Sequence, residues 1–261
     1  MKRLLLIPVA LLGLFLVGRL ALPHAWIHLF FRVDIMLLAG LAAAASVAAG
    51  LGFDRGDHLR TAWLLNAWSY CFVFLGATVR IFPNSRAVLF TRIALAVFGN
   101  TFGIASVWLF ARTYRVAGLE LPGSTLRKGL FVAGAVVLAT LAAGHSLYLG
   151  VVQGMAGDLE QWVGAVSSAG DIATFVLVAP VLLTALALRG GLLVWPWGLY
   201  VASNVAWLLF DAQDTLSSLV HEAAGQVLED YGETWRTLGC AVMVCAALAQ
   251  RRLNKGDDDT A

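Results

Sequence analysis

Long apolar blocks separated by short polar segments run through the whole chain. Each block continues for about twenty residues with almost no charge, which is the length that an α-helix needs to cross the hydrocarbon core of a bilayer. The pattern therefore predicts an all-α integral membrane protein with eight transmembrane helices. We expect them at residues 4–22, 34–53, 61–79, 87–111, 129–152, 162–188, 192–211 and 235–250.

The distribution of Lys and Arg orients these helices, because basic residues concentrate on the cytoplasmic side of membrane proteins. With the N-terminus inside, twelve of them fall in cytoplasmic segments and four, at positions 32, 80, 86 and 236, fall on the outer side. The other two, Arg19 and Arg92, lie within predicted helices. The bias predicts that both ends of the chain are cytoplasmic.

The first and the last predicted helices leave alternatives open. The basic start followed by apolar residues also resembles a signal peptide, but Arg19 interrupts it and no small-residue cleavage site follows, which favours an uncleaved anchor. Cleavage would leave seven helices. The last block is short, and we expect Trp235 and Arg251 to hold its two ends at the membrane interfaces.

Composition agrees with a membrane bundle, since 60% of the residues are hydrophobic and only 13% are charged, against about 25% charged in soluble domains. We expect one helical-bundle domain over 1–252 and a short disordered cytoplasmic tail over 253–261. The sizeable loop should be 211–236, with a short interfacial helix at 216–228. Small residues, in a GxxxG motif at 99–103 and an alanine-rich stretch at 42–49, should serve close helix packing, as should the three cysteines.

Ionisable side chains within a membrane helix are costly, so they indicate either a functional site or a buried structural pair. Counted at about 1.5 Å per residue, the polar residues of four predicted helices, from 87–111 to 192–211, fall in one layer in the outer half of the membrane. They follow helical spacing, which predicts that they line a polar pocket open to the outer side. The candidate ligand-binding residues are Arg92, Asn100, His145, Tyr148, Asp171, Asn204 and Asp211.

Two simpler interpretations stand beside the pocket. Arg92 and Asp171 would neutralise each other, and such a pair can fix helix register without any ligand. His145 can be a hydrogen-bonded buried histidine, or a pH-sensitive switch if it titrates near neutrality.

Several kinds of chemistry are absent from the sequence. His145 alone lies well inside a helix, so a bis-histidine haem is excluded, and the lack of lysine in the late helices excludes a retinal Schiff base. His24 and His28 are one helical turn apart, but beside Trp26 they are typical of an interface rather than a metal site. No HExxH, GxSxG or P-loop motif occurs. We therefore expect no cofactor, no metal, no catalytic residue and no nucleic-acid partner.

One region is similar to a known family. Gly170-Asp171 opens a helix that ends at 186–189, a second helix ends at Asp211, and the last follows Asp230-Tyr231-Gly232. Residues 165–250 thereby resemble the C-terminal half of the multi-helix membrane sensory modules of bacterial signalling proteins, which often carry a diguanylate cyclase or histidine kinase domain. The resemblance implies sensing of a ligand or of membrane state, with Asp171 and Asp211 at matching polar positions. No output domain follows residue 252, so it also implies a partner signalling protein.

Three functions follow from these observations. The leading hypothesis is a receptor-like or sensory protein of the bacterial inner membrane that contacts the lipid bilayer, a small-molecule ligand and a membrane or cytoplasmic partner. A secondary transporter of a small solute is the first alternative. The second is an intramembrane or lipid-modifying enzyme, in which His145 and Asp171 would act as an acid–base pair.

Overall fold

The computed structural model describes residues 6–21, 24–83, 85–116, 123–188, 191–220 and 222–256. Within these ranges the fold is all-α, as predicted, and consists of eight helices. They are α1 (Leu6–Ala21), α2 (His24–Gly50), α3 (His58–Val79), α4 (Arg86–Val116), α5 (Thr125–Met155), α6 (Leu159–Ala187), α7 (Val194–Leu219) and α8 (Glu222–Asn254).

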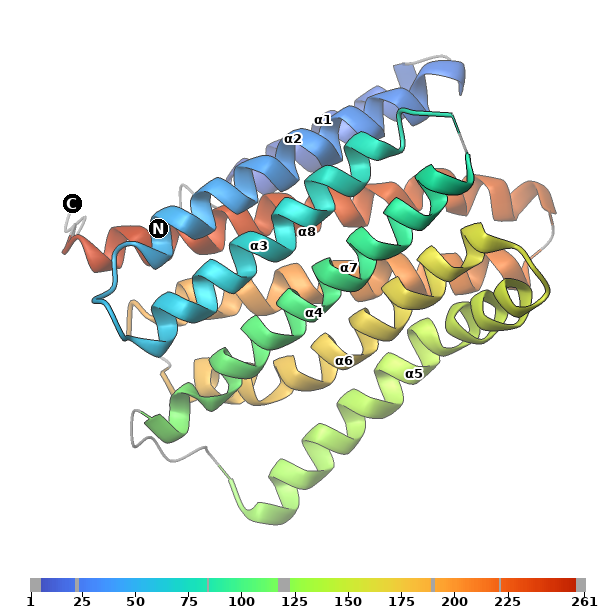
Figure 1. Ribbon diagram of the computed structural model, residues 1–261. Coiled ribbons are helices and arrows are strands. Elements are labelled where there is room, and N and C mark those ends of the chain that lie inside the picture. Colours follow the sequence, from blue (N-terminus) through green and yellow to red (C-terminus); the bar gives the residue numbers. More distant parts are fainter. Residues whose placement is uncertain are drawn as a thin grey trace.

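Five of these helices are long and apolar enough to cross a membrane, namely α3 to α6 and the Leu29–Gly50 part of α2. The chain is thus a multi-pass membrane protein. The helices run alongside one another as an elongated bundle (Figure 1). α1 begins and α8 ends at the same end of this bundle (Figure 1).

Several predicted boundaries were wrong where charged or polar residues interrupt an apolar segment. The expected loop over 211–236, with its interfacial helix at 216–228, does not exist, because α7 continues to Leu219 and α8 already begins at Glu222. Likewise α2 begins at His24, about ten residues before its predicted start. Neither of these segments contains a proline, and polarity alone ends a membrane segment without ending a helix.

The predicted tail also starts too early. Asn254 is the last residue of α8, and its side-chain amide donates to the carbonyl of Ala49. The rest of the expected tail, 257–261, and the start of the expected anchor, 1–5, lie outside the described residues.

A repeated motif begins three of the helices. Gly56, Gly123 and Gly157 each adopt a positive φ, between 94° and 107°, and each is followed by a residue that caps the next helix. Asp57 accepts from the Leu59 amide at the start of α3, and Asp158 accepts from the Glu160 amide at the start of α6. A glycine supplies the left-handed turn and a side-chain oxygen satisfies the first amides, so the chain reverses direction within a few residues.

Six helices form a closed ring. Neighbours in space follow the order α2, α3, α4, α6, α7 and α8, and α8 packs again on α2. The other two helices lie outside this ring: α5 packs against α6 and α7, and α1 packs against α8. In Figure 1 α5 accordingly lies at one edge of the bundle, and α1 and α2 lie at the opposite edge.

Small residues allow the ring helices to approach closely, as predicted. Ala39, Ala42 and Ala49 of α2 have no exposed surface. In the GxxxG motif of α4, a Cβ atom added to Gly103 would lie 3.0 Å from the Ser69 hydroxyl, and one added to Gly99 would lie 3.4 Å from the Cβ of Phe72. Close backbone approach of this kind replaces the hydrophobic effect as the source of helix association in lipid.

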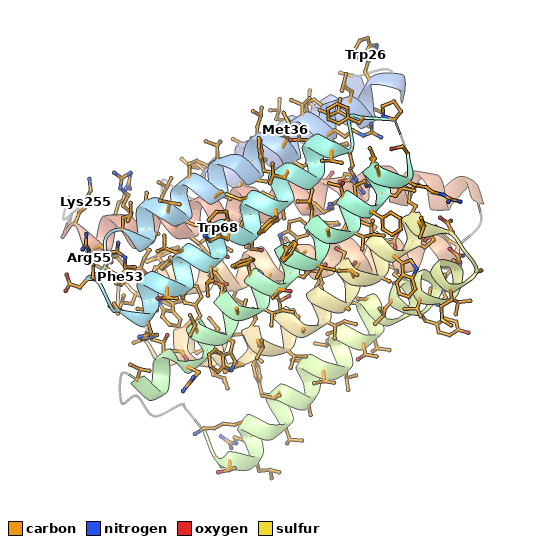
Figure 2. All side chains as sticks on the ribbon, in the orientation of Figure 1. Trp26, Met36, Phe53, Arg55, Trp68 and Lys255 are labelled. Carbon is orange, nitrogen blue, oxygen red and sulfur yellow. The ribbon has the colours of Figure 1, made fainter. Side chains whose placement is uncertain are left out.

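The two ends of the bundle differ in side chains. Arg55 and Lys255 lie at the end where α8 finishes, and Trp26 lies at the opposite end (Figure 2). We call these the Lys255 end and the Arg80 end, the latter after the residue that follows α3. Towards the Lys255 end the core is tightly packed. Trp63 forms edge-to-face contacts with Phe110 and Tyr200, and these two rings pack on each other in a tilted arrangement, with ring centroids 4.5 to 5.9 Å apart.

Candidate functional site

The ring encloses a cavity of about 160 Å³, which we call the ring cavity. An apolar cavity of about this size is large enough for benzene, so a small organic molecule fits. The walls combine apolar side chains from all six ring helices with many polar groups. The polar lining residues are Asn66, Ser69, Tyr70, Arg80, Arg92, Asn100, Ser167, Asp171, Thr174, Tyr200, Asn204, Trp207 and Arg236.

Three arginines line the ring cavity towards the Arg80 end. Arg80 follows α3, Arg92 lies in the second turn of α4, and Arg236 lies in α8. Arg92 is only 7% exposed and donates to Glu160 at 2.8 Å. Glu233 lies 3.8 Å from Arg80 and 3.1 Å from Arg236, so in these contacts three guanidinium groups face two carboxylates.

The positive charges of this cluster act on one another. The nearby Arg236 guanidinium, together with burial, lowers the pKa of Arg80, which lies just past α3, to about 10. The Arg236 guanidinium in turn lies over two aromatic rings, 5.5 Å from the centre of Trp207 and 4.9 Å from that of Phe210. Such cation–π contacts hold a guanidinium in place without neutralising it.

A buried pair of carboxyl groups lies between α6 and α7. Asp171 lines the ring cavity, and its side chain neighbours that of Asp211, which is 2% exposed. The Ser168 hydroxyl donates to the second carboxyl, that of Asp211, at 3.3 Å. Two neighbouring carboxylates that are shielded from water repel each other, so each makes ionisation of the other less favourable.

Deeper in the ring cavity, two amide side chains form part of the lining. The side-chain nitrogen of Asn66 already donates to Ser46 at 2.9 Å, and that of Asn204 donates to the Tyr200 carbonyl at 2.8 Å. Each of these amides still has its carbonyl oxygen and a second N–H, so it can accept from a ligand and donate to it. The ring cavity thus changes from positive charge near the Arg80 end to amide and carboxyl groups further in.

A hydrogen-bonded network closes the cavity on the side of α7 and α8. The Tyr70 hydroxyl contacts the Ser203 hydroxyl at 3.1 Å and accepts from the indole N–H of Trp207 at 3.4 Å. The Ser203 hydroxyl donates to the Gly239 carbonyl at 2.8 Å. These contacts connect α3, α7 and α8, and they fix the orientation of the Trp207 ring that lines the cavity.

Two further cavities adjoin the ring cavity at the Arg80 end, and both are lined by Arg80 and Arg92. One has a volume of about 240 Å³ and includes Glu160 and Glu233. The other, of about 590 Å³, lies between α5, α6 and α7 and includes Asp211. The shared arginines therefore stand where the three spaces meet.

The structure brings together four of the seven predicted binding residues, because Arg92, Asn100, Asp171 and Asn204 all line the ring cavity. Asp211 lines the adjoining 590 Å³ cavity. The remaining two, His145 and Tyr148, belong to α5 outside the ring, and Tyr148 is 64% exposed. In place of α5, the ring cavity is completed by α2, α3 and α8.

The predicted pairs differ from those observed. Arg92 was expected to pair with Asp171, but its ion pair at 2.8 Å is with Glu160 in the first turn of α6, while Asp171 neighbours Asp211. Sequence reasoning also missed Arg80 and Arg236 as lining residues. Hydropathy places Arg80 just after the predicted helix 61–79 and Arg236 at the outer end of the predicted helix 235–250, where a lining residue is not expected.

A metal site finds no support in the described residues, where no group of three His, Cys, Asp or Glu side chains converges. The side chains of His24 and His28 lie outside the described part of the chain. No protein-family model, no curated protein and no solved structure matches the chain. The assignment of function therefore depends on the ring cavity itself.

Proposed function

We propose that this protein is a receptor-like membrane protein that binds a small ligand in the ring cavity. In this proposal all eight helices cross the inner membrane of a bacterium and both ends of the chain are cytoplasmic, which puts the Arg80 end outside. Two features support the orientation. α1 begins and α8 ends at one end of the bundle (Figure 1), and the basic residues Arg55 and Lys255 lie at that same end (Figure 2).

One observation carries the proposal: the polar ring cavity adjoins further cavities at the Arg80 end and is bounded by packed aromatic residues towards the Lys255 end. Trp63 and Phe110 are almost completely buried there. Their contacts with Tyr200 fill the ring on the side of the cavity that faces the Lys255 end. Access from one side is sufficient for a receptor, whereas a transporter needs access from each side in turn.

A receptor of this kind would pass its signal to a partner protein. The resemblance of residues 165–250 to bacterial sensory modules supports this step. Asp171 and Asp211 occupy the polar positions that match those modules. In this proposal occupancy of the ring cavity changes the packing of α6, α7 and α8, and the partner detects the change.

A proton-coupled secondary transporter is the second candidate, and the carboxyl pair favours it. Asp171 lines the ring cavity while Asp211 lines the 590 Å³ cavity, and buried acidic residues in membrane helices often belong to proton pathways. An enzyme that uses His145 and Asp171 has less support, because His145 is absent from the lining of all three cavities.

Cysteine accessibility tests the proposal. Ser167 lines both the ring cavity and the 590 Å³ cavity, whereas Ala169 of the same helix is exposed on the surface of the bundle. We expect a membrane-impermeant methanethiosulfonate to modify Ser167→Cys in right-side-out vesicles but not in inverted ones. Ala169→Cys is the matched lipid-facing control and should react in neither, and the parent protein gives the background of Cys71, Cys240 and Cys245.

The two candidates predict different results. Modification of Ser167→Cys from both sides would favour the transporter over the receptor. If Ser167→Cys reacts no faster than Ala169→Cys from either side, the cavity is closed to aqueous solutes and both candidates are wrong.

A further inference from the structure

We infer that the ring cavity binds a small organic anion, such as a carboxylate, whose opposite end carries hydrogen-bond donors. This inference rests on the proposed function and adds the chemical class of the ligand. It follows from the order of charged, apolar and polar groups along the cavity.

The anion is required by the charges at the entrance. Arg80, Arg92 and Arg236 line the ring cavity, whereas their carboxylate partners, Glu160 and Glu233, do not line it. Guanidinium groups present paired N–H donors that match a carboxylate or a phosphate. A carboxylate on the ligand would bind the guanidinium groups that line the cavity.

The donors are required by the groups further in. Asp171 and the amide oxygens of Asn66 and Asn204 can accept hydrogen bonds, and one carboxyl oxygen of Asp171 is buried without a hydrogen-bond partner among the described residues. A hydroxyl or an amino group on the ligand would donate to this oxygen. A purely apolar end would leave it unpaired, which is unfavourable.

The length and body of the ligand follow from the remaining lining. Apolar side chains, among them Phe72, Leu95, Val163 and Met243, lie on the same cavity wall as these polar groups. They suit a short carbon skeleton. The volume of about 160 Å³ limits the molecule to roughly the size of benzene, so a four-carbon chain with a group at each end is an appropriate probe.

The test compares five probes that share one skeleton: 4-aminobutyrate, 4-hydroxybutyrate, butyrate, butylamine and 1-butanol. Binding to the whole protein in phosphatidylcholine nanodiscs is measured by thermal stabilisation, which increases with ligand concentration relative to its dissociation constant. We expect one or both of the two-ended anions to bind about tenfold more tightly than butyrate. Butylamine should bind least.

Two variants assign the two ends of the ligand. Asn204→Leu should remove the advantage of the two-ended anions and leave butyrate unchanged. Arg236→Gln should weaken every carboxylate probe. Arg112→Gln is the control, because Arg112 is exposed and lies over Trp108, away from the ring cavity, and it should change none of the affinities.

The same chemistry can come from a free solute or from a lipid headgroup such as phosphatidylglycerol, which combines a phosphate with hydroxyl donors. Repeating the measurement in phosphatidylglycerol nanodiscs separates these sources, since a lipid occupant would compete with 4-aminobutyrate or 4-hydroxybutyrate. Competition would identify a lipid ligand, and its absence would identify a free solute. Both results support an anionic ligand that carries hydrogen-bond donors.

The wild-type ranking decides the inference even if a variant fails to fold. Equal binding of butyrate and both two-ended anions, or strongest binding of butylamine, would overturn it. If 1-butanol alone stabilises the protein, the ligand class is wrong while a binding cavity remains. If no probe has any effect, the ligand class is wrong and the proposed receptor function loses its support.

Discussion

The contact between Gly170 of α6 and Asn100 of α4 provides the sharpest test of the helix packing that shapes the cavity. A Cβ atom added to Gly170 would clash with the amide group of Asn100 and would lie 2.8 Å from its Cβ. Because the Cβ itself is too close, a different rotamer of Asn100 does not remove the clash, and α4 and α6 must move apart. Overpacking of this kind costs about 1–3 kcal/mol.

A second glycine on α6 supplies the matched control. A Cβ atom added to Gly164 would meet no atom within 4 Å, so Gly164→Ala should only gain helix propensity, by up to about 1 kcal/mol. Gly170→Ala gains the same amount and loses the packing. The difference in free energy of unfolding between the two variants should therefore equal the overpacking cost, about 1–3 kcal/mol.

Reversible unfolding of both variants by SDS in mixed micelles measures this difference. Adding Asn100→Ala to Gly170→Ala should recover part of the stability, because the amide clash disappears while the contact between Cβ atoms remains. The reasoning is refuted if Gly170→Ala is as stable as Gly164→Ala, since α4 and α6 would then not be in the close contact described.

Two further predictions concern buried hydrogen bonds. Tyr70→Phe removes the contacts with Ser203 and Trp207 and should lower the free energy of unfolding by about 0.5–1.5 kcal/mol. Tyr148 is exposed, so Tyr148→Phe should leave the free energy of unfolding unchanged in the same SDS titration. Equal effects of the two variants would contradict the hydrogen-bonded network. Asp211→Asn keeps an acceptor for Ser168, so its free energy of unfolding should stay within about 1 kcal/mol of wild type. Asp211→Leu leaves buried polar groups unpaired and should lower the free energy of unfolding by about 1–3 kcal/mol more. The order of the thermal midpoints of the two variants checks this prediction.

Much of the bundle could be predicted because bilayer thickness imposes a length on apolar segments. Eight apolar blocks correspond to eight helices in the described residues. Counting residues along the helices also predicts that Arg92, His145, Asp171 and Asn204 share one layer, and all of these except His145 line the ring cavity. Helix ends were predictable only where the sequence supplies a turn, as at Gly157-Asp158. Where an apolar segment gives way to polar residues without such a signal, as at Asp211 and Arg236, hydropathy gives the edge of the apolar segment and not the end of the helix.

The position of α5 could not be found from its apolar residues, because a leucine gains little by facing a helix rather than lipid. The small residues carry the missing information. Ala135, Ala139, Ala143, Gly150 and Gly154 are the buried residues of α5, and at about 100° per residue they cover one narrow stripe of the helix.

That stripe would have identified the polar residues of α5 that face the bundle. Ser146 falls on it, and in the structure the Ser146 hydroxyl donates to Asp214 at 2.9 Å. His145 lies two residues after Ala143, about 200° around the helix and therefore on the opposite side, and Tyr148 is exposed. In a membrane helix the spacing of polar residues shows that they share a face. Only their position relative to the small residues shows whether that face points into the bundle.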